Sequence, residues 1–301
     1  MLENWIFLSL LAPLFWAFSN FVDKYLLGRH TKGIYDFLFF SSVVSWSWIF
    51  IVGLVVFVGL PELNEFTWIP IFTGILLLYS YGFYAKALEK GDTSALVILF
   101  KLIPVVTVVL AFVFLDQTLS ANEWLGFIVV FAGAMIVSLE KIGRKGFIKG
   151  FWLILIAILI WAVITVVIDY GLQKIAFWDY FVLDVLGQGI GGLLLLLIPA
   201  IRREIITGVK AATFKKYNLF MGNNLLDLFG QMSVKKALAL GPSAGLVTVV
   251  TQVQSFYAII IGITLSIFLP RIIKEDISAG TLAKKFIGAA IMFAGIYILL
   301  T

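Results

Sequence analysis

The sequence has no cysteine, one histidine and few charged residues, and each scarcity excludes a class of function. Without cysteine the chain has no disulfide, no thiol catalysis and no zinc–thiolate site. The single histidine, His30, cannot form a histidine metal cluster or a histidine relay, and no dense set of carboxylates takes its place. We therefore expect no metal, no other cofactor and no enzymatic activity.

The low charge predicts a protein whose solvent is lipid. Charged residues make up 13% of the chain and hydrophobic residues 62%, with a mean hydropathy of +1.08. A soluble domain carries about a quarter of its residues as charges. The net charge of +5 does not indicate nucleic-acid binding, because the basic residues lie in short loops and form no continuous patch. The N-terminus lacks the basic start and cleavage site of a signal peptide, so the first helix is expected to remain.

Ten apolar stretches come close to the roughly 20 residues that span a bilayer. They lie at about 4–27, 34–60, 66–88, 93–115, 122–140, 150–173, 177–201, 217–236, 242–269 and 282–300. Their apolar runs are continuous and do not alternate, which favours helices over a β-barrel. The short connections leave no room for a soluble domain. The sequence therefore predicts an all-α membrane protein with ten transmembrane helices.

The positive charges predict the orientation of these helices. Nearly all of the 22 Lys and Arg residues fall in the odd-numbered connections. Cytoplasmic loops are enriched in Lys and Arg. This bias places the odd connections in the cytoplasm and both termini outside, in a multi-pass protein of the cytoplasmic (inner) membrane. The alternative is a miscounted helix, which would spoil the regular pattern.

Three internal similarities predict a duplicated five-helix unit. The segment that begins at Lys86 and ends at Val97 resembles the segment from Lys236 to Val247. Phe-Ala-Gly occurs at 131–133 and at 293–295, and Trp-Ala occurs at 16–17 and at 161–162. Units of five helices insert with opposite orientations. We therefore expect two inverted repeats, residues 1–145 and 146–301, with extra residues at Pro270 to Thr281 and a substrate site near the membrane midplane.

The chain also resembles the drug/metabolite transporter superfamily, in particular its ten-helix EamA-type members. The resemblance rests on Phe15-Trp16-Ala17, Ala87-Leu88, Gly91, Ser94-Ala95, Pro104 and the Gly126…Phe131-Ala132-Gly133 ending. It implies two five-helix halves around a central cavity lined by helices 1, 3, 4, 6, 8 and 9, and transport by alternating access. Two features depart from the family pattern: Asp116-Gln117 stands where relatives often have Gly-Glu, and the second connection has no positive charge.

The richest polar pattern lies between Met221 and Ser255. Asn223, Asp227 and Gln231 recur every four residues and so share one face of a helix. Polar groups at membrane depth are unfavourable and mark pathways. We expect Asn223, Asn224, Asp227, Gln231 and, in the next helix, Gln252 to bind substrate. The alternative is interhelical hydrogen bonding, which contributes only ~0.6–2 kcal/mol for each bond.

Lys101 is the one lysine expected deep inside a hydrophobic segment. A lysine at mid-helix disfavours insertion by ~2.5–3.5 kcal/mol, which requires compensation. Lys101 is expected to bind an anionic group of the substrate, with Asp227 as its best candidate partner. The alternative is a structural ion pair between two helices.

The remaining candidates come from helices 1, 6 and 7. Trp16, Asn20 and Trp161 are expected to contribute to the substrate site, with plain packing as the alternative for the tryptophans. Asp23 and Asp169 are expected at the membrane interface, with a role as a ligand as the alternative. Asp184 and Gln188 are kept as secondary candidates on a more peripheral helix, and Gly187 and Gly191 predict close helix packing.

These observations favour a secondary active transporter, an exporter or exchanger, for a small polar metabolite that is zwitterionic or anionic. Its expected partners are the substrate, membrane lipid and protons coupled through Asp227, with no nucleic acid, in a monomer or homodimer. The alternative is a flippase for a lipid-linked head group, for which Arg271 and Lys274 would bind anionic lipid.

Overall fold

The structure, a computed structural model, describes residues 4–56, 61–90, 99–138, 144–268 and 279–299, and in these residues helices are joined by turns and short loops. Each of the ten expected stretches contains a helix, and α9 is additional. The elements are α1 (Trp5–Arg29), α2 (Ile34–Val56), α3 (Trp68–Lys90), α5 (Leu102–Leu115), α6 (Ala121–Ser138), α7 (Arg144–Leu172), α8 (Phe177–Leu195), α9 (Pro199–Lys210), α10 (Phe214–Leu240), α11 (Ala244–Val250), the 3-10 turn η1 (Thr251–Val253), α12 (Gln254–Phe268) and α13 (Ala279–Ile298).

Five helical segments of the described chain are long and apolar enough to cross a membrane: Trp5–Arg29, Ile34–Ile51, Trp68–Ala87, Gly150–Leu172 and Ala244–Leu265. The pair α8 and α9, bent by 107°, would add a sixth, and two further apolar helices are shorter. The expected count of ten spans is therefore not confirmed. α10 is not among these spans, and it carries a row of buried polar residues, described below.

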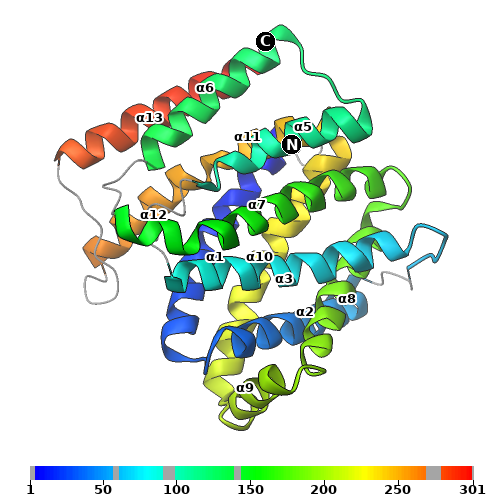
Figure 1. Cartoon of the computed structure of the whole chain (residues 1–301). Coiled ribbons are helices and arrows are strands. Elements are labelled where there is room, and N and C mark those ends of the chain that lie inside the picture. Colours follow the sequence, from blue (N-terminus) through cyan, green and yellow to red (C-terminus); the bar gives the residue numbers. More distant parts are fainter. Residues whose placement is uncertain (1–3, 57–60, 91–98, 139–143, 269–278, 300–301) are drawn as a thin grey trace.

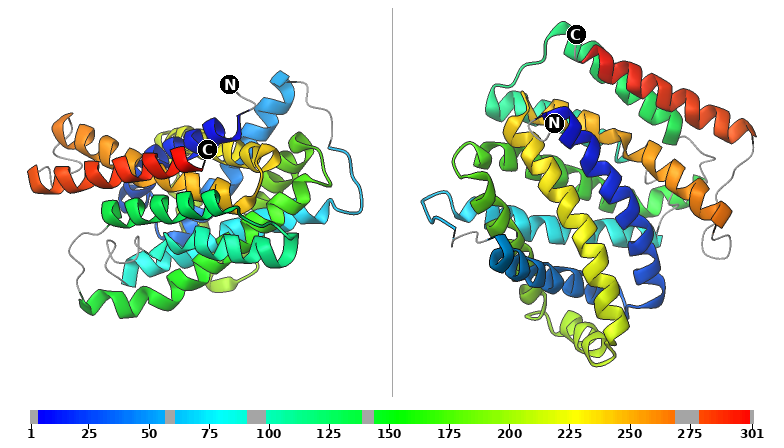
Figure 2. Two further views of the ribbon diagram at one scale, coloured as in Figure 1. Left: turned by 90° about the horizontal axis from the view of Figure 1, so that it is seen from above. Right: turned by 180° about the vertical axis from the view of Figure 1, so that it is seen from behind.

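The helices form two layers that cross at a steep angle (Figure 1). α1 packs along α10 in one layer, and α3 packs along α7 and α8 in the other. The view from behind shows α1 and α10 side by side (Figure 2). α2 contacts α8 and α10, and α5 contacts α7 and α11. The polar side chains of α10 consequently face helices from both halves of the chain.

α6 and α13 pair with each other at one side of the molecule (Figure 1). A Cβ atom added at Gly133 would lie 2.6 Å from the carbonyl oxygen of Gly288, and one added at Gly295 would lie 2.6 Å from the backbone nitrogen of Val130. Only glycine permits such a close approach of two backbones. Both Phe-Ala-Gly motifs therefore supply the contact between these helices.

Gly187 confirms the expected close packing of α8. A Cβ atom there would lie 2.2 Å from the carbonyl oxygen of Ile71 on α3. This contact brings the backbones of α3 and α8 together, so that Asp184, one turn earlier on α8, comes within hydrogen-bonding distance of α3.

Gln117 joins three helices at the end of α5. Asp116 ends α5 in the left-handed conformation, with φ of 53°. The Gln117 side chain then accepts a hydrogen bond from the backbone N–H of Ala244 (3.0 Å) and donates one to Asp169 Oδ2 (2.6 Å). The Asp116-Gln117 pair, which departs from the family pattern, therefore links the ends of α5 and α7 to the start of α11.

A buried ion pair holds α2 to α10. Lys216 Nζ lies 2.9 Å from Asp36 Oδ2, and both side chains are buried. The sequence pattern placed Lys216 in a connection as a topology signal, which is wrong. α10 begins at Phe214 behind the N-cap Thr213, so Lys216 lies in its first turn and points inward.

Some predictions lie outside the described residues. They concern Gly91, Ser94 and Ala95 of the family motif, Arg271 and Lys274 of the flippase hypothesis, and most of the extra segment after Pro270. The division into units 1–145 and 146–301 also stays a prediction.

Candidate functional site

The first part of the site connects α1 to α10 through Asn223. Ser19 Oγ donates a hydrogen bond to Asn223 Oδ1 (3.1 Å), and Asn223 Nδ2 donates to Asp23 Oδ1 (2.6 Å). Asn223 and Ser19 are buried. Asp23 was expected at the interface, but this contact includes it in the polar network of the two helices.

Asp23 and Asp227 form a carboxylate pair. Asp227 is close enough to Asp23 to affect it electrostatically, and Trp16, Tyr81 and Lys235 lie close enough to Asp227 to interact with it. The Trp16 Nε1–H is buried and makes no hydrogen bond of normal geometry, although it is close to the Asp227 carboxylate. In the described part of the chain, neither carboxylate has an ion-pair partner. Two like charges in a low-dielectric interior attract a cation.

A ring of hydrogen bonds lies next to this pair. Lys235 Nζ donates to Asp184 Oδ2 (2.8 Å) and to Gln231 Oε1 (2.9 Å), and Gln188 Nε2 donates to the same two oxygens (3.0 and 2.8 Å). Gln231 Nε2 then donates to Asp227 Oδ2 (2.6 Å). The ring thus extends to the carboxylate pair through one amide group.

The ring also reaches α3. Thr73 Oγ1 donates to Asp184 Oδ1 (2.8 Å) and lies 3.1 Å from the Tyr180 hydroxyl. Asp184, Thr73 and Tyr180 are fully buried. The resulting network runs from α1 through α10 and α8 to α3, and all its members are enclosed by apolar helices.

Four aromatic side chains form a panel beside the carboxylate pair. Trp161 lies 5.8 Å from Tyr81, 5.9 Å from Tyr84 and 5.0 Å from Phe100, measured between ring centroids. Tyr81 and Tyr84 both lie close enough to Asp23 to interact with it electrostatically. The panel therefore extends from the carboxylates on α1 and α10 to the start of α5.

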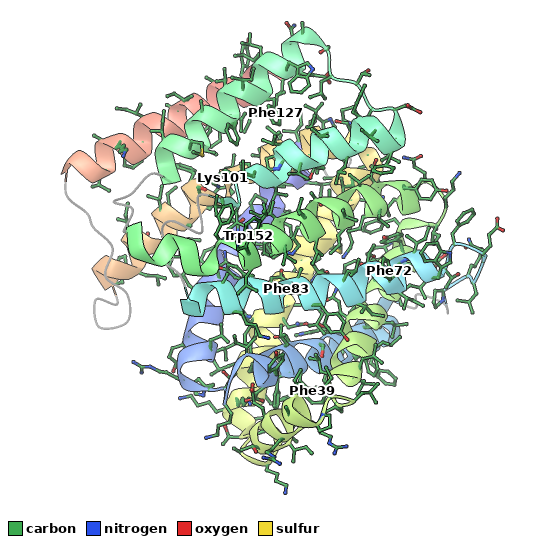
Figure 3. All side chains as sticks on the ribbon, viewed as in Figure 1. Phe39, Phe72, Phe83, Lys101, Phe127 and Trp152 are labelled. Carbon is green, nitrogen blue, oxygen red and sulfur yellow. The ribbon has the colours of Figure 1, made fainter. Side chains whose placement is uncertain are left out.

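Lys101 is next in sequence to Phe100, the panel residue nearest the start of α5. It is 5% exposed and sits inside the molecule at the start of α5 (Figure 3). Its Nζ donates a hydrogen bond to Ser255 Oγ on α12. In the described residues no carboxylate pairs with Lys101. The expected partnership with Asp227 is wrong in this conformation, because Asp227 contacts Gln231 instead.

The structure does not bring all predicted residues into the network. Asn224 donates to Ser41 O (3.1 Å) and Ser45 Oγ (2.9 Å) on α2, and Gln252 donates to Thr248 O of its own helix turn (3.1 Å). Asn20 is exposed on α1. These contacts are of the kind that helix packing uses, whereas Trp16, Trp161, Asn223, Asp227 and Gln231 lie in or beside the network.

Lys235 is the main residue that the sequence analysis missed. The expected helix ended at 236, so Lys235 was counted with a loop, and Lys101 was taken as the one deeply placed lysine. α10 continues to Leu240, and Lys235 is 1% exposed. The signal was present, since residue 235 continues the four-residue spacing of Asn223, Asp227 and Gln231. Asp184 and Gln188, which had been secondary candidates, lie in the centre of the network.

A cavity of about 350 Å³ lies elsewhere, between the start of α3 and the end of α7. Its lining residues are Glu65, Phe66, Trp68, Ile69, Val167 and Tyr170. None of them was predicted to bind substrate, and none belongs to the polar network.

Comparisons with known proteins agree with this architecture. The family model described as "EamA-like transporter family" matches residues 3–139. A solved structure titled "Crystal structure of protein" superposes with a TM-score of 0.68 at 12% identity, covering 98% of this chain and 95% of that chain. At this identity the likeness shows the fold alone. No curated protein matches the chain in sequence.

The apolar helices and the family match define a multi-pass membrane protein of the transporter class. Within that class, residues 3–139 match the EamA-like transporter family of the drug/metabolite transporter superfamily, which confirms the resemblance seen in the sequence motifs.

Proposed function

We propose that this protein is a secondary active transporter for a small zwitterionic metabolite, which it exports or exchanges across the cytoplasmic membrane. One arrangement carries the proposal. The Asp23–Asp227 pair lies beside the tyrosines of the aromatic panel, and Lys101 is next in sequence to its Phe100. A molecule with an ammonium group and a carboxylate would match the carboxylate pair and Lys101, and an ammonium is also attracted to aromatic faces.

Alternating access follows from an inverted repeat, and the helix packing supports one. α1 packs along α10, and α7 packs along α3. These are equivalent pairs if the second five-helix unit repeats the first. α6 with α13 and α2 with α8 are the matching pairs between the units. The site lies between the two units, where their relative movement would open it to either side of the membrane.

Exchange against protons would use the same carboxylates. Asp23 and Asp227 lie close enough to interact, and neither forms an ion pair in the described structure. Either a proton or the substrate ammonium relieves their repulsion, so the two compete for one site. Such competition couples the movement of the substrate in one direction to that of protons in the other.

Transport assays of variants that each remove one charge test the assignment of Asp227 and Lys101 to the substrate site. A thermal-shift screen of metabolites on the purified protein first identifies a ligand, because a bound ligand raises the melting temperature. Exchange in proteoliposomes is then measured for Asp227→Asn and Lys101→Met, with Lys174→Gln, which lies beside Phe66 and Tyr170 outside the network, as a control. Asp227→Asn should slow exchange of the zwitterion but leave exchange of an analogue without the amine unchanged. Lys101→Met should leave exchange of an analogue without the carboxylate unchanged. Unchanged exchange in both variants would refute the site.

A further inference from the structure

The amphipathic helix α9 lies across the end of the helix body instead of running with it. It follows α8 after a bend of 107° and occupies the lower edge of the molecule in Figure 1. Its inner face is anchored by the buried residues Ile205 and Gly208. Large apolar side chains of α9 and its flanks are nevertheless exposed, namely Leu197, Ile198, Ile206, Val209 and Phe214.

The same surface has an excess of positive charge. Its exposed cations are Lys32, Arg202, Arg203, Lys210 and Lys215. In the described part of the chain none of the five forms an ion pair. The nearby carboxylates are already used: Asp36 pairs with Lys216, and Glu204 accepts the backbone N–H groups of Tyr35 (2.9 Å) and Asp36 (3.2 Å). The surface therefore presents cations without matching anions.

We propose that α9 is an interfacial helix that binds the head groups of anionic phospholipids. Exposed cations beside exposed apolar side chains are what such a surface binds: the cations contact lipid phosphates, and the apolar groups enter the acyl region. On the α9 helix, Ile206 and Val209 flank Arg202, with Arg203 and Lys210 next to them at the spacing of one turn. This inference is independent of the transported substrate.

The contacts of α9 connect lipid binding to the rest of the fold. Gly208 fits directly against the Asp36 carboxylate, and its carbonyl lies 3.5 Å from Lys216 Nζ. Glu204 holds the first turn of α2. Because α9 is attached to α2 and α10 in this way, a lipid that binds docked α9 should stabilise the whole chain.

The first experiment measures the melting temperature of the full-length protein in neutral detergent while phosphatidylglycerol or phosphatidylcholine is added. Phosphatidylglycerol should raise it, and phosphatidylcholine and soluble glycerol phosphate should not. The double variant Arg202→Gln/Arg203→Gln should lose more than half of the shift, and so should wild type in high salt. The control Lys174→Gln/Lys236→Gln also removes two positive charges, but near Phe66 and Phe177, away from α9. It should keep the full rise in melting temperature. The proposal would be overturned if the two lipids raised the melting temperature equally, or if phosphatidylglycerol raised it equally in the arginine variant and in the lysine control.

The second experiment uses the absence of cysteine, which makes any introduced cysteine unique. An environment-sensitive fluorophore is attached to Ile206→Cys on the apolar side of α9 or to Thr207→Cys on the other exposed side. In phosphatidylglycerol vesicles the label at 206 should shift to shorter wavelength, and the label at 207 should shift much less. Identical emission at the two positions would contradict an interfacial helix, even if the arginine variant failed to fold.

Discussion

Lys235 on α10 and Asp184 on α8 form a fully buried ion pair, with 2.8 Å between Nζ and Oδ2. The pair also determines which end of the Gln231 amide faces Asp227. A lysine ammonium has only donors, so the oxygen of Gln231 must point toward Lys235 and its NH₂ group toward Asp227. Lys235 therefore acts on the carboxylate pair through Gln231.

Replacing Lys235 should be strongly destabilising. Lys235→Met leaves Asp184 buried without its partner charge, which is expected to lower the stability by ~3–5 kcal/mol. The double variant Lys235→Met/Asp184→Asn removes the unpaired charge and should recover part of that loss. Denaturation in detergent for the single and double variants gives the coupling energy. Equal losses in both would contradict a stabilising ion pair between Lys235 and Asp184.

Asn223 on α10 and Asn20 on α1 provide a buried and an exposed asparagine for comparison. Asn223→Ala removes the hydrogen bonds to Ser19 and Asp23 and should destabilise the protein by ~1–3 kcal/mol. Asn20→Ala changes an exposed side chain and should stay within ~0.5 kcal/mol of wild type. Thermal unfolding of both variants measures the difference. Similar melting temperatures would mean that the network between α1 and α10 contributes little.

Replacing two glycines, one in α6 and one in α13, with alanine should change the stability in different ways. A Cβ atom in Gly133→Ala would meet backbone atoms of α13, so the variant should be destabilised by ~1–3 kcal/mol, as overpacking usually is. Gly280→Ala meets nothing within 4 Å and replaces a helical glycine, so it should be neutral or gain up to ~1 kcal/mol. Melting temperatures distinguish the two, and a neutral Gly133→Ala would show that the pair is loosely packed.

Lys216 and Lys215 are adjacent in the chain but differ in environment. Lys216→Met leaves Asp36 buried and unpaired, and we expect a loss of ~3–5 kcal/mol. Lys215→Met removes an exposed charge and should change the stability by less than ~0.5 kcal/mol. Unfolding measurements on both variants test whether the ion pair between α2 and α10 holds this end of the protein together. Indistinguishable variants would contradict that role.

Much of the architecture was predictable from local patterns. Runs of apolar residues near the spanning length placed a helix in each expected stretch, since such runs can satisfy their backbone hydrogen bonds in lipid only as helices. Gly187 correctly indicated a close helix contact. The four-residue spacing of Asn223, Asp227 and Gln231 identified the polar face of α10 before its partners were known.

Other features depended on which helices become neighbours. Lys216 and Lys235 have the sequence signature of loop cations, and only their pairing with Asp36 and Asp184, which lie far away in the chain, makes them interior residues. Periodicity assigns a side chain to a face of its own helix but does not say which helix covers that face. The sequence by itself therefore determined the helices and their polar faces. The tertiary structure decided which charges pair and which stay without a counter-ion, because burial and partnership depend on helix packing.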